Sequence, residues 1–339
     1  MSSAHRQVYV VTACLCAATL LLGLLGMTAG SRGFETELGW LDPVVQDIRL
    51  PRTVGAWLAG GLLGLAGALA QGLFRNPLAD PYLLGSAPGA ALGVALALEL
   101  DSWGGHQFTG QLAWPVQWLG QLGLTGVAFV GAWGAVLLTL LLARGVQHTV
   151  RLLLAGVVVG VVLGACTSLL MATQPALWPA MQAFLLGYTG MLTQASCVWM
   201  GVVLLLSWLA AWRWGSLLDG LTLGEDTARS LGLQVGTLRT GLLAVMALCT
   251  ATAVAQTGLI AFVGLVAPHL VRSSVRVRFA MSSLLSVLMG GVLLCLAEML
   301  ARSWMAPQEL PVGVLTAIMG GSYLMWRLGS ASVSLGDRT

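Results

Sequence analysis

Long apolar runs, separated by short segments that carry arginine, constrain this chain more than any other feature. The runs cover approximately residues 8–29, 51–74, 86–100, 120–143, 152–172, 191–212, 240–258, 259–271, 280–300 and 312–326. Because 57% of the residues are hydrophobic and only 9% are charged, this apolar surface is too large for one soluble core and must face lipid. A membrane-crossing helix needs about 20 apolar residues, so we predict an all-α polytopic membrane protein of about ten transmembrane helices, with residues 1–339 as one transmembrane domain.

The placement of arginine predicts the orientation of these helices. With the N-terminus in the cytoplasm, twelve of the sixteen arginines fall on the cytoplasmic side and only Arg32, Arg49, Arg52 and Arg302 fall outside. Basic residues favour the cytoplasmic side of short loops, so both termini are expected to be cytoplasmic. The first run is longer than the apolar core of a usual signal peptide. We therefore expect an uncleaved first span rather than a cleaved leader.

One stretch does not fit a regular alternation of full spans. Residues 240–271 carry no formal charge apart from a possible proton on His269, and the flanking Arg239 and Arg272 both belong inside. Two full spans would need about 40 residues. We therefore predict one span to Gly258 and a short or re-entrant return through 258–267, which requires cover by protein or a water-filled cavity.

Composition excludes several kinds of chemistry. The chain contains no lysine, so it lacks the phosphate-binding loop of P-loop ATPases, whose lysine contacts the nucleotide. Its six cysteines lie in apolar runs and its four histidines have no ligand spacing, so we expect no metal site, catalytic residue or cofactor in this chain. Buried acids are scarce, which argues against an ion-coupled secondary transporter. That class nevertheless stays open as an alternative.

Several segments are too specific in sequence to be simple spacers. They read R-L-P-R at 49–52, Q-G-L-F-R-N-P-L-A-D-P at 71–81, L-G-E-D-T-A-R-S-L-G at 223–232, T-G-L-I-A-F-V-G-L-V-A-P-H-L-V-R at 257–272 and, more weakly, E-L-P-V-G at 309–313. In this order and spacing, from about residue 45 to residue 328, they resemble the FecCD-type permeases. That family imports ferric siderophores, haem and vitamin B12, and its subunits have ten transmembrane helices with both termini cytoplasmic.

The resemblance implies a set of partners. It implies a permease of the bacterial inner membrane that pairs with a second permease subunit, which we expect to be identical although a heterodimer is the open alternative. It also implies two copies of an ATPase subunit, which hold ATP and Mg²⁺, and a periplasmic substrate-binding protein. No nucleic-acid partner is expected. We expect a ferric siderophore or haem as the substrate, with vitamin B12 as the alternative.

The resemblance also implies roles for individual residues. Arg49, Arg52 and Arg302 would dock the binding protein. The alternative is that they pair with a nearby acid such as Asp47 or Glu309, or extend to the membrane–water interface by snorkelling. A cytoplasmic coupling loop at 215–238 would contact the ATPase through Gly224, Glu225, Asp226, Ala228, Arg229, Leu231 and Gly232, and the alternative is a solvated loop helix. A cytoplasmic gate would include Asn76, Leu78, Thr149 and Val150, although Asn76 also suits a helix cap. The translocation pathway would be lined by Gly156, Gly160, Gly164 and Gly313.

Glycine spacing gives a further expectation that comes from the residues alone. Gly60, Gly64 and Gly67 share one face of the second run, and Gly156, Gly160 and Gly164 repeat at four-residue spacing in the fifth. Small residues allow helices to approach closely in lipid. We therefore expect tight helix packing at these faces, and lining of a solute pathway is the functional alternative.

Overall fold

The structure of the chain, a computed structural model, describes residues 3–30, 33–34, 42–103, 115–143, 149–222 and 235–336. These residues are almost entirely helical. The long helices are α1 (Ser3–Thr28), α2 (Leu50–Phe74), α3 (Ser86–Trp103), α4 (Pro115–Leu142), α5 (Thr149–Thr173), α7 (Gln194–Arg213), α10 (Val235–Thr257), α12 (Phe279–Ser303) and α13 (Val312–Gly336). The strands β1 (Ala29–Gly30) and β2 (Gly33–Phe34) form one two-residue antiparallel pair. The predicted all-α class is confirmed.

Shorter helices connect these long ones. A π-helical turn, η1 (Val45–Arg49), leads directly into α2, and the 3-10 turns η2 (Pro81–Leu84) and η3 (Pro175–Leu177) precede α3 and α6 (Trp178–Leu186). Helices α8 (Gly215–Thr222) and α11 (Val263–Ser274) have 8 and 12 residues. Every predicted apolar run therefore contains a helix, but α6 was not predicted as a separate element.

Seven helices among the described residues are long and apolar enough to cross a membrane. They cover Arg6–Thr28, Val45–Phe74, Gly123–Leu142, Val150–Thr173, Gln194–Arg213, Val235–Thr257 and Phe279–Ser303. Residues 86–100 of α3 are apolar but shorter than a full span. The chain is therefore a multi-pass membrane protein. A full crossing by α3, α11 or α13 stays a prediction.

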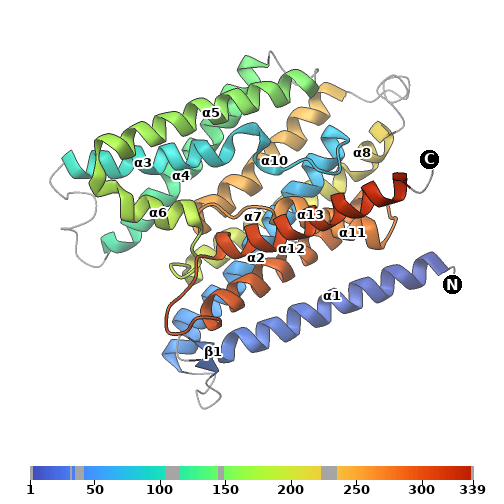
Figure 1. Cartoon of the computed structure of the whole chain (residues 1–339), viewed down its shortest axis with the longest axis horizontal. Coiled ribbons are helices and arrows are strands. Elements are labelled where there is room, and N and C mark those ends of the chain that lie inside the picture. Colours follow the sequence, from blue (N-terminus) through green and yellow to red (C-terminus); the bar gives the residue numbers. More distant parts are fainter. Residues whose placement is uncertain are drawn as a thin grey trace.

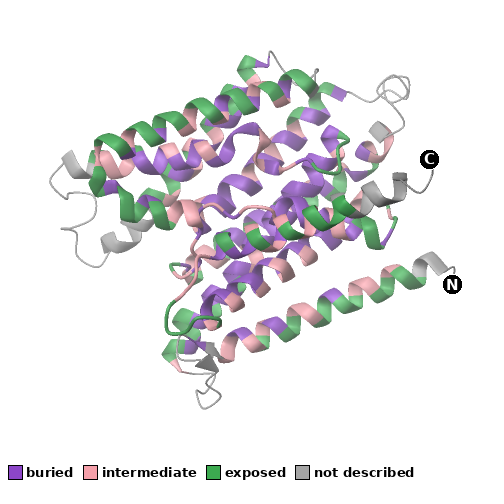
Figure 2. Ribbon diagram, in the orientation of Figure 1, coloured by how far each residue is buried: buried purple, intermediate pink, exposed green. Residues whose placement is uncertain are grey.

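Helix α2 forms the centre of the bundle, and α12 packs closely along it (Figure 1). Buried residues concentrate on these two helices and on α10, whereas α1 and α5 are exposed along much of their length (Figure 2). A Cβ atom at Gly60 would lie 2.2 Å from the carbonyl oxygen of Gly290, and one at Gly290 would lie 2.2 Å from that of Gly60. The predicted glycine face of α2 is thus a packing surface where two backbones meet.

The uncharged stretch forms one long helix, as predicted, followed by a turn and a short helix, and a return across the membrane at this point stays a prediction. Helix α10 ends at Thr257, and α11 starts at Val263 after a turn in which Gly258 and Phe262 have positive φ values of 68° and 67°. Gly258 and Ile260 in this turn are buried, and Leu259, Ala261 and Phe262 are partly buried. Protein groups satisfy its backbone: the Leu259 N–H donates to Phe184. Irregular backbone at this depth is tolerated because protein covers it.

Candidate functional site

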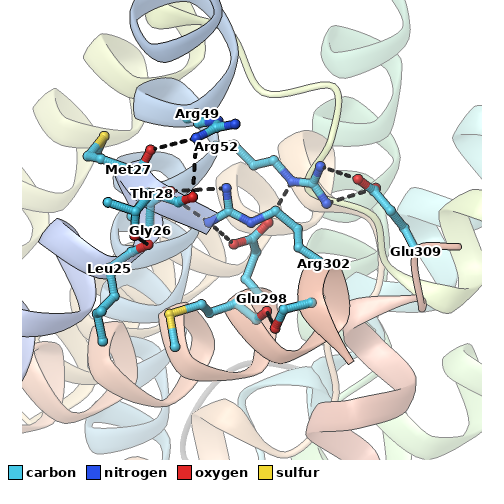
Figure 3. A network of polar contacts seen from close by, with 12 residues as sticks. Leu25, Gly26, Met27, Thr28, Arg49, Arg52, Glu298, Arg302 and Glu309 are labelled. Atoms are coloured by element: carbon cyan, nitrogen blue, oxygen red, sulfur yellow. Dashed lines mark hydrogen bonds and ion pairs between the residues drawn. The ribbon is translucent and has the colours of Figure 1, made fainter. Parts of the chain in front are cut away.

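A cluster of three arginines and two glutamates joins the ends of three helices (Figure 3). We call Arg49, Arg52, Arg302, Glu298 and Glu309 the arginine network. Arg49 and Arg52 lie where η1 passes into α2, Glu298 and Arg302 lie on the last turns of α12, and Glu309 lies in the loop before α13. The C-terminal end of α1 completes the cluster through its backbone carbonyls. These helix ends therefore share one end of the bundle, the end that the arginine placement predicts to be periplasmic.

Arg52 has a carboxylate on each side of its guanidinium group. Its Nε donates to Oε1 of Glu298, a side chain that is 0% exposed. On the other edge, Nη1 and Nη2 donate to Oε1 and Oε2 of Glu309 at 2.8 and 2.9 Å, which is a bidentate pair. The guanidinium also lies 5.9 Å from the centroid of the Tyr188 ring. This geometry uses the planar fork that distinguishes arginine from lysine.

Glu298 is shared between two arginines. Its Oε2 lies 2.8 Å from Nη2 of Arg302, one turn further along α12. Arg302 also donates to the Gly26 carbonyl at 3.3 Å and to the Thr53 hydroxyl at 3.1 Å. Glu298 therefore ties α2 and α12 together, and Arg302 adds the end of α1.

Arg49 contacts the same end of α1 by a different route. Its Nη1 donates to the backbone carbonyls of Met27 and Thr28 at 3.0 and 3.2 Å. These carbonyls belong to the last residues of α1, which have no partner within their own helix. Arg49 thus caps α1 from outside and fixes its position against α2.

Glu309 is the most exposed carboxylate in the network, with a side chain that is 22% exposed. The hydrogen bonds from Arg52 hold the pKa of Glu309 below its usual value, while partial burial opposes this effect. Tyr188 adds a long hydrogen bond of 3.4 Å from its hydroxyl to Oε2 of Glu309. Glu309 is therefore ionised at neutral pH and lies at the rim of an otherwise buried cluster.

These positions bear directly on the predicted docking arginines. Arg49, Arg52 and Arg302 are 5%, 6% and 2% exposed, so all three are buried within the chain. The alternative of a pair with Glu309 is confirmed for Arg52, whereas Asp47 instead accepts a hydrogen bond from the Gln194 side chain. Docking of a partner stays a prediction, and contact with Arg52 or Arg302 now requires the network to open first.

The structure describes only part of the predicted coupling loop at 215–238. Helix α8 (Gly215–Thr222) forms its beginning, and the Asp219 carboxylate accepts a hydrogen bond at 3.1 Å from the N–H of Phe279, the first residue of α12. The named coupling residues lie outside the described residues: Gly224, Glu225, Asp226, Ala228, Arg229, Leu231 and Gly232. What the structure shows is that α8 is anchored to α12.

The predicted gate segment forms a turn at the other end of α2. Arg75 ends the helix with φ of 49°, and the side chain of Asn76 accepts a hydrogen bond at 3.0 Å from the Leu78 N–H. This bond closes a local turn after the helix, whereas the C-terminal cap residue of α2 is Arg75, so Asn76 is not the helix cap that was considered. Both Asn76 and Leu78 are exposed. Thr149 opens α5, and the side chain of Val150 is 79% exposed. A gate at these exposed positions stays a prediction.

A shallow groove lies next to this segment. It has a volume of 360 Å³ and is lined by one side of α5, by the chain between α2 and α3, and by the first turn of α3. The lining residues are Asp80, Tyr82, Leu83, Gly85, Pro88, Gly156, Val157, Gly160 and Val161. Asp80 accepts a hydrogen bond from the Tyr82 N–H, and burial raises the pKa of its carboxyl while that bond opposes the rise.

Only two of the four glycines predicted to line a pathway line this groove. Gly156 and Gly160 line it, and Gly164, further along α5, has open space where a Cβ would be. Gly313 does not share this position. It is buried, and a Cβ there would lie 2.3 Å from the Leu186 carbonyl oxygen. In this structure Gly313 therefore serves close packing rather than the lining of a groove.

Sequence reasoning missed two members of the site. Neither Glu298 nor Tyr188 was assigned to the site from the sequence. The signal for Glu298 was present, since an acid deep in an apolar run must be paired to be tolerated. Among the described residues no group of three or more His, Cys, Asp or Glu side chains could hold a metal ion.

Comparisons with known proteins give a consistent result. Residues 7–329 match the FecCD transport family. The vitamin B12 import system permease protein BtuC of Pectobacterium atrosepticum is 36% identical over 327 residues, which is 93% of this chain and 92% of the relative. BtuC of Salmonella paratyphi A is 35% identical over 91% of each chain.

Solved structures agree in fold. A structure described as an inward-facing conformation of a metal-chelate type ABC transporter has a TM-score of 0.78 and 28% identity, and the match covers 92% of this chain and 97% of that chain. PsaBC from Streptococcus pneumoniae matches with a TM-score of 0.59 at 17% identity over 82% of this chain and 89% of that chain. The second match shows the fold alone.

Proposed function

This chain belongs to the FecCD transport family and is a permease subunit of an ABC importer, and we propose that it carries vitamin B12 through the bacterial inner membrane as half of a dimeric pathway. The chain is a transport subunit, and ATP hydrolysis belongs to a separate subunit. We further propose ten crossings with both termini in the cytoplasm. The arginine placement supports this orientation, because it puts twelve of sixteen arginines inside.

The observation that carries the substrate proposal is the identity of the relatives. Vitamin B12 import permeases are similar to this chain over more than nine-tenths of its length at 34–36% identity. This evidence favours vitamin B12 over the ferric siderophore or haem expected from the sequence. A ferric chelate is the second candidate, because the solved metal-chelate type transporter shares 28% identity and nearly the whole fold.

The exposed apolar surface supports a dimer. On α5, Val150, Leu154, Val157 and Val161 are all at least 52% exposed. These side chains are spaced three or four residues apart, so they lie on one face of the helix. A second permease subunit, an identical copy in this proposal, would cover this face beside the groove, and lipid would cover the outward-facing remainder.

The ATPase contact is proposed at the cytoplasmic end. Two ATPase copies, which hold the ATP and Mg²⁺, would receive the 215–238 loop. Because Asp219 on α8 holds the first backbone N–H of α12, a displacement of the loop would act directly on α12. Helix α12 in turn packs along α2, the centre of the bundle. This route gives the coupling loop a mechanical connection to α2, the helix that precedes Asn76 and Leu78.

Delivery is proposed at the opposite end of the bundle. A periplasmic binding protein would dock over the arginine network and release its substrate into the dimer axis. Among the residues that the structure describes, the arginine network gathers several ionised side chains at this end of the bundle. Arginine in this setting offers bidentate pairing with partner carboxylates.

The substrate proposal is tested by uptake into cells that lack their own vitamin B12 permease. Expression of this chain with its ATPase and binding protein should restore accumulation of radiolabelled cyanocobalamin. A radiolabelled ferric siderophore and haem serve as parallel substrates. Accumulation of a ferric chelate without cyanocobalamin would reject vitamin B12 and leave the family assignment intact.

A further inference from the structure

The acid-binding edges of Arg52 are both occupied. The inward edge, Nε, is held by Glu298, which has no exposure, and the outward edge, Nη1 and Nη2, is held by Glu309 at the rim. The side chain of Arg52 is 8% exposed and that of Glu309 is 22% exposed. Glu309 is therefore the more exposed member of the pair, and it occupies the Nη1 and Nη2 edge of Arg52 (Figure 3).

The charges on this part of the network are balanced. Arg52 and Arg302 carry two positive charges, and Glu298 and Glu309 carry two negative charges. If Glu309 stays in place, a third carboxylate finds no free guanidinium edge on Arg52. It would also lie next to Glu309, and like charges at such distances repel. A carboxylate from outside can bind Arg52 only by exchange with Glu309.

The backbone next to Glu309 leads directly into α13. It lies three residues before the first residue of α13, and hydrogen bonds hold the intervening backbone. The Leu310 N–H donates to Ala301 at 3.0 Å, and the Val312 N–H donates to Gly187 at 3.1 Å. Helix α13 begins at Val312, and Gly313 packs against the buried turn between α10 and α11 through the Leu259 carbonyl oxygen. Movement of Glu309 therefore acts on the start of α13.

We propose that Glu309 is an internal stand-in for a carboxylate of the binding protein. Docking replaces Glu309 on the outward edge of Arg52, and the released 304–311 segment loosens the start of α13. The exchange keeps a bidentate carboxylate on Arg52, because the incoming group takes the place of Glu309. This inference rests on the proposed docking of a binding protein at this end, and it explains how buried arginines can take part.

The test measures the affinity of the binding protein of the same import system for the complete importer in lipid nanodiscs. The Glu309→Gln variant removes the competing charge and keeps the side-chain size. The neighbouring Gln308→Ala variant is the matched control, because Gln308 is exposed and its described hydrogen bond uses only its backbone. At low salt we expect Glu309→Gln to bind about tenfold more tightly, as loss of a charge-assisted competitor predicts, and Gln308→Ala to bind as the wild type does.

Hydrogen exchange on the wild-type complex gives an independent readout. Addition of the binding protein should speed exchange at the amides of Leu310 and Val312. Unchanged or weaker binding by Glu309→Gln, or slower exchange at both amides on docking, would overturn the stand-in role while leaving docking intact. If the binding protein neither binds the wild-type importer nor stimulates its ATPase, the docking proposal itself fails and this inference falls with it.

Discussion

Replacement of Glu298 by alanine is the most informative perturbation of the arginine network. Glu298 is fully buried and is the shared partner of Arg52 and Arg302, with 2.8 Å between its Oε2 and the Arg302 Nη2. Its removal leaves two buried guanidinium groups close together without their common counter-charge. Breaking a buried pair in this way costs about 3–5 kcal/mol, because the remaining charge is uncompensated.

Thermal unfolding of the purified protein in detergent measures this loss. At about 2 °C per kcal/mol for a large domain, the unfolding midpoint of Glu298→Ala should fall by roughly 6–10 °C. Glu309→Ala should cost less, about 1–3 kcal/mol, because Glu309 lies at the rim. The double variant Glu298→Ala with Arg302→Met should be more stable than Glu298→Ala alone, because it removes one of the unpaired charges. A Glu298→Ala midpoint equal to that of the wild type, or above that of Glu309→Ala, would refute the reasoning.

The remaining predictions concern packing, pH, the gate and the coupling loop. Gly60→Ala places a Cβ against a carbonyl oxygen at 2.2 Å and should cost about 1–3 kcal/mol in thermal stability, whereas Gly164→Ala meets open space and should be neutral. The pKa of Glu309 is lowered in the folded state, so its contribution is present above the unfolded pKa of about 4.3 and is lost as pH falls through the folded pKa. The difference in unfolding midpoint between the wild type and Glu309→Gln should therefore vanish in acid, and a difference that grows in acid would contradict the assignment. Cysteines at Asn76 in a cysteine-free dimer should crosslink in one nucleotide state, and crosslinking in every state would count against a gate. Glu225→Arg should uncouple ATP hydrolysis from uptake without loss of membrane insertion, and normal uptake would show that the loop does not couple.

Local sequence features predicted the parts of the fold that depend on local physics. Apolar runs located the helices, and the length of the uncharged stretch between Arg239 and Arg272 predicted that one long helix is followed by a shorter element, which is α11. The amide of Asn76 indicated that α2 ends near this position, and Asn76 lies in the turn after the helix. These features depend on the length of a run, on backbone restriction and on side chains that satisfy nearby backbone groups, which are properties that a short segment carries by itself.

The candidate site depended on contacts between distant segments, and sequence reasoning reached it only in part. Arg52 and Glu298 are 246 positions apart, so no local pattern pairs them. The arginines were expected to dock a partner because of the family resemblance, and pairing with a nearby acid was the alternative. Burial instead follows from the meeting of α1, α2 and α12, whose helix-end carbonyls and acids supply the partners. Gly313 was similarly placed by resemblance, and its packing against Leu186 depends on how α6 and α13 meet.

The most direct test of the importer assignment is uptake by proteoliposomes that contain this chain. The liposomes hold ATP and Mg²⁺ inside, and the binding protein loaded with radiolabelled cyanocobalamin is added outside. The account predicts accumulation that requires the ATPase subunit, hydrolysable ATP and the binding protein together, with none when the ATPase is omitted or a proton or sodium gradient replaces ATP. Accumulation driven by an ion gradient in the absence of the ATPase would contradict the account and identify a secondary transporter.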